Sequence, residues 1–124
     1  MISVEQAKCV PKFSLKGFEV DAIITKVYDG DTVHAVFALE EQGYYRWSCR
    51  LAKINTPELR SIDSEERGLA RKAKLALADK VLHQQVRLRL GKFDKYGRLL
   101  ATIYLNDENI NEWLISKGYA MPYM

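Results

Sequence analysis

Residues 29–32 read Asp29-Gly30-Asp31-Thr32 and place two carboxylates in a tight turn directly before a run of alternating residues. Short carboxylate side chains in such a turn can converge on a hard cation, because Ca²⁺ prefers oxygen ligands. Asp-Gly is also the commonest hairpin turn, so this tetrapeptide alone favours a structural role. It becomes a candidate cation site only in combination with other residues.

A second group, Asn55-Thr56-Pro57-Glu58, ends a predicted strand. Pro57 fixes the local backbone and thereby orients the Thr56 carbonyl. Asn55 offers a side-chain oxygen, and Glu58 is held rigidly enough to accept a proton from a nearby water. The alternative interpretation is a turn at the end of a strand with a solvated glutamate.

Two arginines complete the set of candidates, because Arg50 occupies the polar face of a predicted strand and Arg98 begins another. Two guanidinium groups that converge on one point can bind a phosphate bidentately and neutralise the charge that develops on it during in-line attack. A single arginine on a strand is usually solvated. Only the joint occurrence of both arginines with the two oxygen-rich groups predicts a phosphate site.

The elements that must position these residues follow from periodicity. Period-two alternation predicts strands at residues 19–28, 32–39, 44–54, 86–90 and 98–105, and a helical pattern predicts helices at 64–82 and 108–117. This is a mainly β fold with helices, of the α+β class. The order matches a five-stranded oligonucleotide-binding (OB) barrel with a helix between the third and fourth strands and a C-terminal helix, although order alone does not establish that the barrel closes.

The length of 124 residues, with 48% hydrophobic and 28% charged residues, indicates one domain and excludes a disordered, collagen-like or membrane-spanning chain. We expect a poorly specified leader at residues 1–18 and the domain at 19–124. Neither a signal peptide nor an apolar run of membrane-spanning length is visible. The default expectations are therefore an intracellular (cytoplasmic) location, no membrane contact and a monomer.

The net charge is only +3, but it is unevenly distributed. Residues 46–98 carry fourteen Lys and Arg against six Asp and Glu, whereas the remainder of the chain is acidic. A concentrated positive charge suits an anionic partner such as a phosphodiester backbone. The alternative is a solvated basic helix face, and charge alone does not decide between the two.

Taken together, these motifs resemble the staphylococcal nuclease-like (thermonuclease) family. The resemblance runs from about Val20 to Ala120 and rests on motifs in the family's order, namely Asp29-Gly30-Asp31-Thr32, Arg50-Leu51, Asn55-Thr56-Pro57-Glu58, Asp94-Lys95-Tyr96-Gly97-Arg98, and Asn111-Glu112 through Gly118. It implies a five-stranded OB barrel and a calcium-dependent phosphodiesterase that acts on DNA and RNA with little sequence preference.

The resemblance also implies a role for each matched residue. Asp31 matches a calcium-ligand carboxylate, and Thr56 matches the residue that supplies a backbone carbonyl to the cation. Glu58 matches the glutamate usually assigned as general base for water. The remaining matches concern the substrate: Arg50 and Arg98 match the arginines that bind the phosphate and stabilise the transition state, and Lys95 and Tyr96 match residues that contact the nucleotide.

Asn55 departs from the family pattern, which usually has a second calcium-binding aspartate there. The amide keeps an oxygen ligand but removes a full charge, so weaker calcium binding is expected, with partial compensation by Asp29 through a water.

Three interpretations of the function follow: an active nuclease, a catalytically weak module that still binds single strands through Tyr96 and the basic segment, and a protein-interaction domain that retains the barrel and the motifs without their activity. Retention of Asp31, Glu58 and both arginines argues against the third.

Overall fold

The computed structural model describes residues 1–40 and 43–123. Its elements along the chain are α1 (Val4–Lys8), β1 (Glu19–Asp29), β2 (Thr32–Ala38), β3 (Tyr44–Leu51), β4 (Ile54–Asn55), α2 (Ser64–Val81), β5 (Gln85–Phe93), β6 (Leu99–Leu105), β7 (Glu108–Asn109), α3 (Ile110–Ser116) and β8 (Met121–Pro122). Among these described residues, no helix is both long and apolar enough to cross a membrane.

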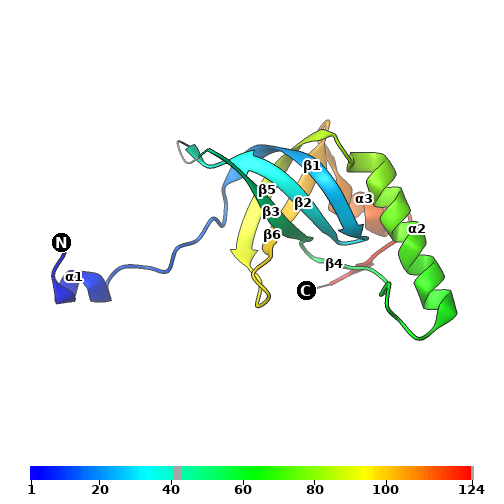
Figure 1. Ribbon diagram of the computed structural model, residues 1–124, viewed down its shortest axis with the longest axis horizontal. Coiled ribbons are helices and arrows are strands. Elements are labelled where there is room, and N and C mark those ends of the chain that lie inside the picture. Colours follow the sequence, from blue (N-terminus) through cyan, green and yellow to red (C-terminus); the bar gives the residue numbers. More distant parts are fainter. Residues whose placement is uncertain (41–42, 124) are drawn as a thin grey trace.

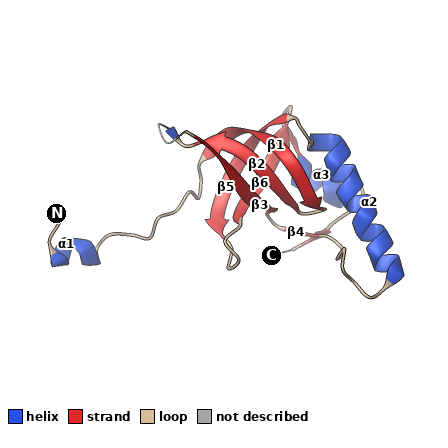
Figure 2. Cartoon of the chain, in the orientation of Figure 1, coloured by secondary structure: helices blue, strands red, loops and turns tan. Residues whose placement is uncertain are grey.

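Five strands close into a mixed barrel (Figure 2). Antiparallel pairs run in the order β3-β2-β1-β5-β6, and a parallel pair between β3 and β6 closes the sheet. The helix α2 lies between the third and fourth of these strands, and α3 follows the fifth. The predicted OB barrel of the α+β class is therefore confirmed, including the closure that periodicity could not establish.

The barrel closes around side chains that alternate along each strand. On β2, Val33, Ala35 and Phe37 are fully buried, and on β3 so are Cys49 and Leu51. Because neighbouring side chains on a strand point to opposite faces, the residues between them lie on the outer face of the barrel. Arg50 lies there, as the sequence predicted.

The long helix α2 covers one end of the barrel beside the turn between β1 and β2 (Figure 1). It begins after Asp63, whose side chain accepts a hydrogen bond from the backbone N–H of Glu65. Its buried residues are small or aliphatic and recur at helical spacing: Ala70, Ala73, Leu77 and Val81. These four buried residues form one stripe along α2.

The structure differs from the predicted elements in several places. The predicted strand at 44–54 is interrupted after Leu51, because the chain turns at Lys53, whose φ of 65° lies in the left-handed region. The last helix begins only at Ile110, since Asn109 caps it. Short α1 and β8 were not predicted. In the segment before β1, Leu15 is buried in the core, whereas α1 lies away from the barrel (Figure 1).

Candidate active site

The turn between β1 and β2 places Asp31 in contact with Thr56. Asp31 is buried, and its Oδ2 accepts hydrogen bonds from the backbone N–H of Thr56 at 3.2 Å and from its hydroxyl at 2.9 Å. Gly30 permits this approach, because a Cβ there would lie 2.9 Å from the Cβ of Ala73 and 3.0 Å from Cγ2 of Thr56. Two motifs that lie 25 residues apart are thus joined at one carboxylate.

Arg50 joins this carboxylate to the turn after β3. Its Nη2 lies 3.5 Å from Asp31 Oδ2 and donates to the Ile54 carbonyl at 2.9 Å, while its Nη1 donates to the Leu51 carbonyl at 2.6 Å. Nη2 also lies 3.5 Å from Asn55 Oδ1. The guanidinium group therefore stands between the side-chain oxygens of Asp31 and Asn55.

Arg98 is positioned by the loop between β5 and β6. Asp94 accepts hydrogen bonds from the backbone N–H groups of Tyr96 and Arg98, both at 2.9 Å, and from Nε of Arg98 at 2.8 Å. Burial of Asp94 favours its protonated form, but the hydrogen bonds from Arg98 and Tyr96 outweigh this and lower its pKa. Asp94 thus stays ionised and fixes both the loop and the arginine.

The two arginines connect to the same carboxylate, Arg50 directly and Arg98 through the Thr32 hydroxyl. Nη1 of Arg98 donates to the Thr32 hydroxyl at 3.4 Å, and that hydroxyl donates to Asp31 Oδ1 at 3.3 Å. Arg50 contacts the other oxygen of Asp31, as described above. The β3–β6 pairing brings the strands together, since Arg50 pairs with Leu100 in the register.

A hollow of about 260 Å³ lies between the arginines. Among the described residues that line it, one side chain, that of Asp94, is acidic and four are basic, namely Arg50, Lys53, Lys95 and Arg98. Because Asp94 is already paired with Arg98, the hollow carries a net positive charge suited to an anion. Tyr96 and Tyr123, both exposed, line it as well.

Lys95 and Tyr96 extend from the loop that holds Arg98. The Lys95 ammonium lies 5.1 Å from the centre of the Tyr96 ring, and the Arg98 guanidinium carbon lies 5.4 Å from it. Tyr96 is 72% exposed and keeps most of its surface available. A planar base could stack on this ring beside the arginines.

Glu58 is the one predicted catalytic residue that no contact joins to this cluster. Its side chain is exposed in the segment that follows Pro57, and within residues 1–40 and 43–123 it makes no hydrogen bond or ion pair. Its backbone carbonyl accepts a bond from Ser61 N–H at 3.3 Å. Asn55 is also exposed, and its side chain meets the cluster at Arg50.

The acidic side of the site fits a hard cation in chemistry. Burial and the nearby charge of Asp31 raise the pKa of Asp29 to about 6, because two carboxylates share one turn. A cation would relieve this repulsion, and Asp31, the Asn55 amide oxygen and a backbone carbonyl are oxygen donors of the kind that Ca²⁺ takes. Among the described residues, no group of three or more His, Cys, Asp or Glu side chains is arranged to bind a metal.

Sequence reasoning missed Tyr123 and Lys53 and gave Asp94 no role. Tyr123 reaches the hollow because β8 pairs with β4 and its N–H donates to the Lys53 carbonyl at 2.8 Å. Strands of two residues leave no periodicity to detect. Asp94 stood in a motif that the sequence identified, and its spacing of four from Arg98 was the available signal.

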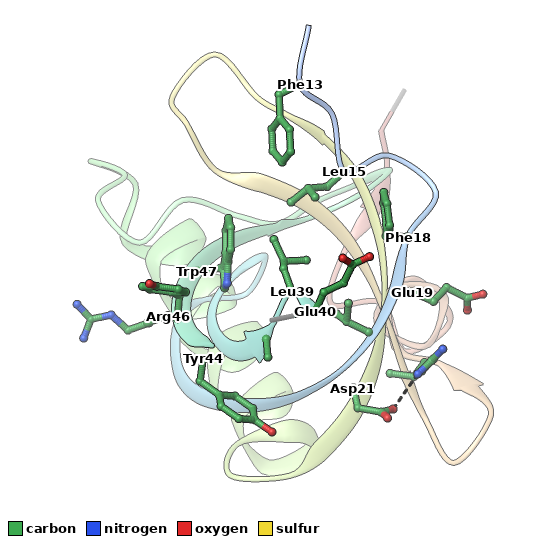
Figure 3. A pocket seen from close by; sticks show the side chains of 14 residues that line it. Phe13, Leu15, Phe18, Glu19, Asp21, Leu39, Glu40, Tyr44, Arg46 and Trp47 are labelled. Atoms are coloured by element: carbon green, nitrogen blue, oxygen red, sulfur yellow. Dashed lines mark hydrogen bonds and ion pairs between the residues drawn. The ribbon is translucent and has the colours of Figure 1, made fainter. Parts of the chain in front are cut away.

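A larger hollow, of about 1040 Å³, lies at the opposite end of β2 and β3 (Figure 3). Its wall is formed largely by apolar and aromatic side chains, among them Phe13, Leu15 and Trp47. The charged residues around it have both signs, and Asp21 is paired with Arg87 there. The larger volume therefore does not mark the phosphate site.

Comparison with known proteins agrees with the geometry around Arg50 and Arg98. The sequence model of the staphylococcal nuclease homologue family matches residues 48–124, which include both arginines, Asn55-Thr56-Pro57-Glu58 and the loop from Asp94. The chain belongs to this family. The turn that carries Asp31 precedes the matched range and joins the nuclease-homologue site through its contacts with Thr56 and Arg50.

Relatives of this staphylococcal nuclease homologue come from several organisms. An uncharacterized endonuclease of Haemophilus influenzae is 35% identical over 101 residues, which cover 81% of this chain and 51% of that protein. A probable endonuclease of Schizosaccharomyces pombe is 34% identical over 83 residues, covering 61% and 36%. An uncharacterized protein of Bacillus anthracis is 31% identical over 114 residues, covering 89% and 51%. The chain thus spans about half or less of the length of these relatives.

Proposed function

We propose that this protein is a calcium-dependent nuclease that hydrolyses phosphodiester bonds in DNA, RNA or both with little sequence preference. The observation that carries this proposal is that Arg50 and Arg98 line one hollow and both connect to Asp31. Membership of the staphylococcal nuclease homologue family and the names of two relatives as endonucleases support it.

The cation would be held by Asp31, Asn55 and the carbonyl of Thr56. When bound, Ca²⁺ supplies charge that polarises a phosphate oxygen and orients water for attack. Asp31 is suited to this because Thr56 fixes its orientation through two hydrogen bonds. Asn55 contributes an oxygen without a charge, so we expect the affinity for calcium to be modest.

The arginines would bind the scissile phosphate and stabilise the negative charge that grows on it during attack. Each guanidinium group is partly buried, where hydrogen bonds to an anion are stronger than in water. Asp94 holds Arg98 by its Nε, and the outer nitrogens, of which Nη1 contacts the Thr32 hydroxyl at 3.4 Å, would turn toward the phosphate. This arrangement supplies positive charge in place before the reaction begins.

Glu58 would accept the proton of the attacking water. Its exposure leaves its carboxylate accessible to water, and the adjoining Pro57 restricts the backbone that carries it. Because the side chain has no contact with Asp31 in the structure, its alignment would be completed by bound substrate.

Lys95 and Tyr96 would bind the nucleotide next to the scissile bond, with Lys95 on a phosphate and Tyr96 against a base. Stacking and phosphate contacts do not read base edges, so this mode of binding fits weak sequence preference.

The proposal is tested by measuring cleavage of single-stranded DNA and RNA with calcium and after chelation. Glu58→Gln, Arg98→Ala and Arg50→Lys should each reduce kcat by about 100-fold or more. Glu112→Gln and Arg89→Ala change the same residue types at exposed positions outside the site and should keep wild-type activity. Full activity in all three site variants, or cleavage that persists in chelator, would exclude this mechanism.

A catalytically weak module that binds single strands is the second candidate. It is favoured by Asn55, which leaves the cation with one carboxylate fewer than the family pattern. Such a module would bind strands in the presence of chelator and release no product with calcium at any concentration, whereas a nuclease would release product in proportion to bound calcium.

A further inference from the structure

The outer face of β2 and β3 runs as an uninterrupted surface away from the candidate active site. Directly paired residues lie on the same face of a sheet, and the pairs along this face are Thr32 with Arg50, His34 with Ser48, Val36 with Arg46, and Ala38 with Tyr44. On the neighbouring strand β1, Lys26 pairs with His34. The first of these pairs belongs to the candidate active site.

We name this surface the outer track and define it by Lys26, Tyr28, His34, Tyr44, Arg46 and Ser48. Along β3 it extends from Tyr44 to Arg50 at the candidate active site, six residue steps that correspond to about 20 Å at the usual rise of a strand. All of its members except the half-buried His34 are exposed.

The charge of the outer track is positive and uncompensated by its own strands. β2 and β3 contain no Asp or Glu, nor does β1 between Ala22 and Tyr28. In the portion of the chain that the structure describes, Lys26 and Arg46 form no ion pair. The basic strand β5 is different, because Arg87 is paired with Asp21 and Arg89 lies opposite Glu19.

His34, in the middle of the outer track, responds to this charge. Burial lowers its pKa, and the positive charges of Arg46 and Lys26 lower it further. The imidazole therefore lies in the field of both cations, although they belong to different strands. A polyanion laid along β2 would meet the same field.

Exposed aromatic rings accompany the cations. Tyr44 is 77% exposed and Tyr28 46% exposed, and the Lys26 ammonium lies 5.7 Å from the centre of the Tyr28 ring. Alternation of cations with exposed rings is the chemistry that binds single-stranded nucleic acid, because cations contact the phosphates while the bases stack.

The outer track ends at Tyr44. Figure 3 shows Tyr44 at the edge of the larger hollow and Arg46 extending outward from it. Beyond this edge the wall of the hollow is largely apolar, and neither Glu40 nor the ion pair between Asp21 and Arg87 continues the positive charge of the track. The basic surface is thus bounded by the candidate active site on one side and by this largely apolar hollow on the other.

We propose that the outer track binds the single strand that continues from the scissile phosphate, and that it makes the protein prefer long strands to short ones. This rests on the proposed nuclease function, since the strand is anchored at Arg50 and Arg98. Lys26 and Arg46 contact phosphates, and Tyr28 and Tyr44 stack with bases. OB folds occupy about 4–16 nucleotides of single strand, and the length of the track suits the lower part of that range.

Binding is measured by fluorescence anisotropy with a labelled single strand of about 12 nucleotides, in chelator so that no cleavage occurs. The double variant Lys26→Ala/Arg46→Ala should weaken binding about tenfold or more. It should also reduce the slope of log Kd against log salt by about 1.4, because each phosphate contact to a single strand contributes about 0.7. The matched control Arg89→Ala/Lys117→Ala removes two exposed charges elsewhere and should leave the slope within about 0.3 of wild type.

Cleavage of a dinucleotide and of the same long strand, with calcium, separates this proposal from the proposed function. The track variant should lose kcat/KM on the long strand and keep wild-type kcat/KM on the dinucleotide, which reaches only the arginines. Three outcomes would refute binding of the strand by the outer track. They are equal losses on both substrates, a salt slope equal to that of the control variant, and displacement of the strand by polyglutamate at equal charge concentration. A wild-type protein that cleaves neither substrate would instead overturn the nuclease, and the salt slope would still decide whether the track binds strands.

Discussion

Replacement of Asn55 by aspartate tests whether this position limits cation binding. Asn55 is exposed, and its Oδ1 lies 3.5 Å from Arg50 Nη2, which lies at the same distance from Asp31 Oδ2. A carboxylate in contact with a dication gains on the order of 10 kcal/mol at an effective dielectric near 20, most of which the loss of hydration offsets. The new carboxylate also gains an ion pair with Arg50, which at an exposed position contributes only about 0.2–1 kcal/mol.

We therefore expect Asn55→Asp to tighten calcium binding by about tenfold to hundredfold, which corresponds to about 1.4–2.7 kcal/mol. Isothermal titration calorimetry at fixed ionic strength measures the affinity, and the calcium concentration for half-maximal cleavage should shift in parallel. Asn106→Asp adds the same charge at an exposed turn between β6 and β7 and serves as control. Unchanged affinity in Asn55→Asp, or an equal gain in the control, would refute the reasoning.

Three further predictions concern the support of the site. The pKa of Asp29 is raised from 3.8 to about 6, so its contribution to stability is present below pH 3.8 and is lost as the pH rises through 6. In chelator, Asp29→Asn should therefore raise the free energy of unfolding by about 1–2 kcal/mol at pH 8 and change it little at pH 4, as measured by thermal unfolding. Asn111→Leu should lose about 3–5 kcal/mol in urea unfolding, because the buried N–H of Ile103 and the carbonyls of Ala52 and Ala101 lose the amide that binds them. Gly30→Ala should lower the free energy of unfolding by about 1–3 kcal/mol and weaken calcium binding, since its Cβ would collide with Ala73. Gly68→Ala, which has open space around it in α2, should instead raise the free energy of unfolding by about 0.5–1 kcal/mol. Similar effects at both glycines would contradict the packing argument.

Much of the barrel could be predicted because its strands are half-buried and alternate. Val33, Ala35 and Phe37 follow one another at intervals of two and are all fully buried, so the pattern in the sequence is the pattern of the core. The turn at Lys53 could not be predicted, since a left-handed backbone at a lysine has no sequence signal. The pairing of β4 with β8 could not be predicted either, because it depends on the closed fold and strands of two residues leave no periodicity to detect.

The candidate site was predictable in its parts and unpredictable in its connections. Asp31 and Thr56 each stood in a motif, but nothing local indicates that Thr56 donates twice to Asp31, because 25 residues separate them. The barrel brings these two residues together, and the space that Gly30 leaves allows their close approach. Residue types therefore indicated the chemistry, and only the fold gave the distances.

The Arg50 guanidinium group makes contacts that its residue type and position in the sequence did not indicate. A single arginine on the polar face of a strand is usually solvated, yet the Arg50 side chain is only 14% exposed and donates hydrogen bonds to the carbonyls of Leu51 and Ile54. Its charge already faces Asp31, so phosphate binding would exchange contacts and not simply add them. Truncation to alanine would release the turn as well as the phosphate contact. Lysine keeps the charge but lacks the planar fork, and for that reason its effect on kcat reports the geometry of phosphate binding.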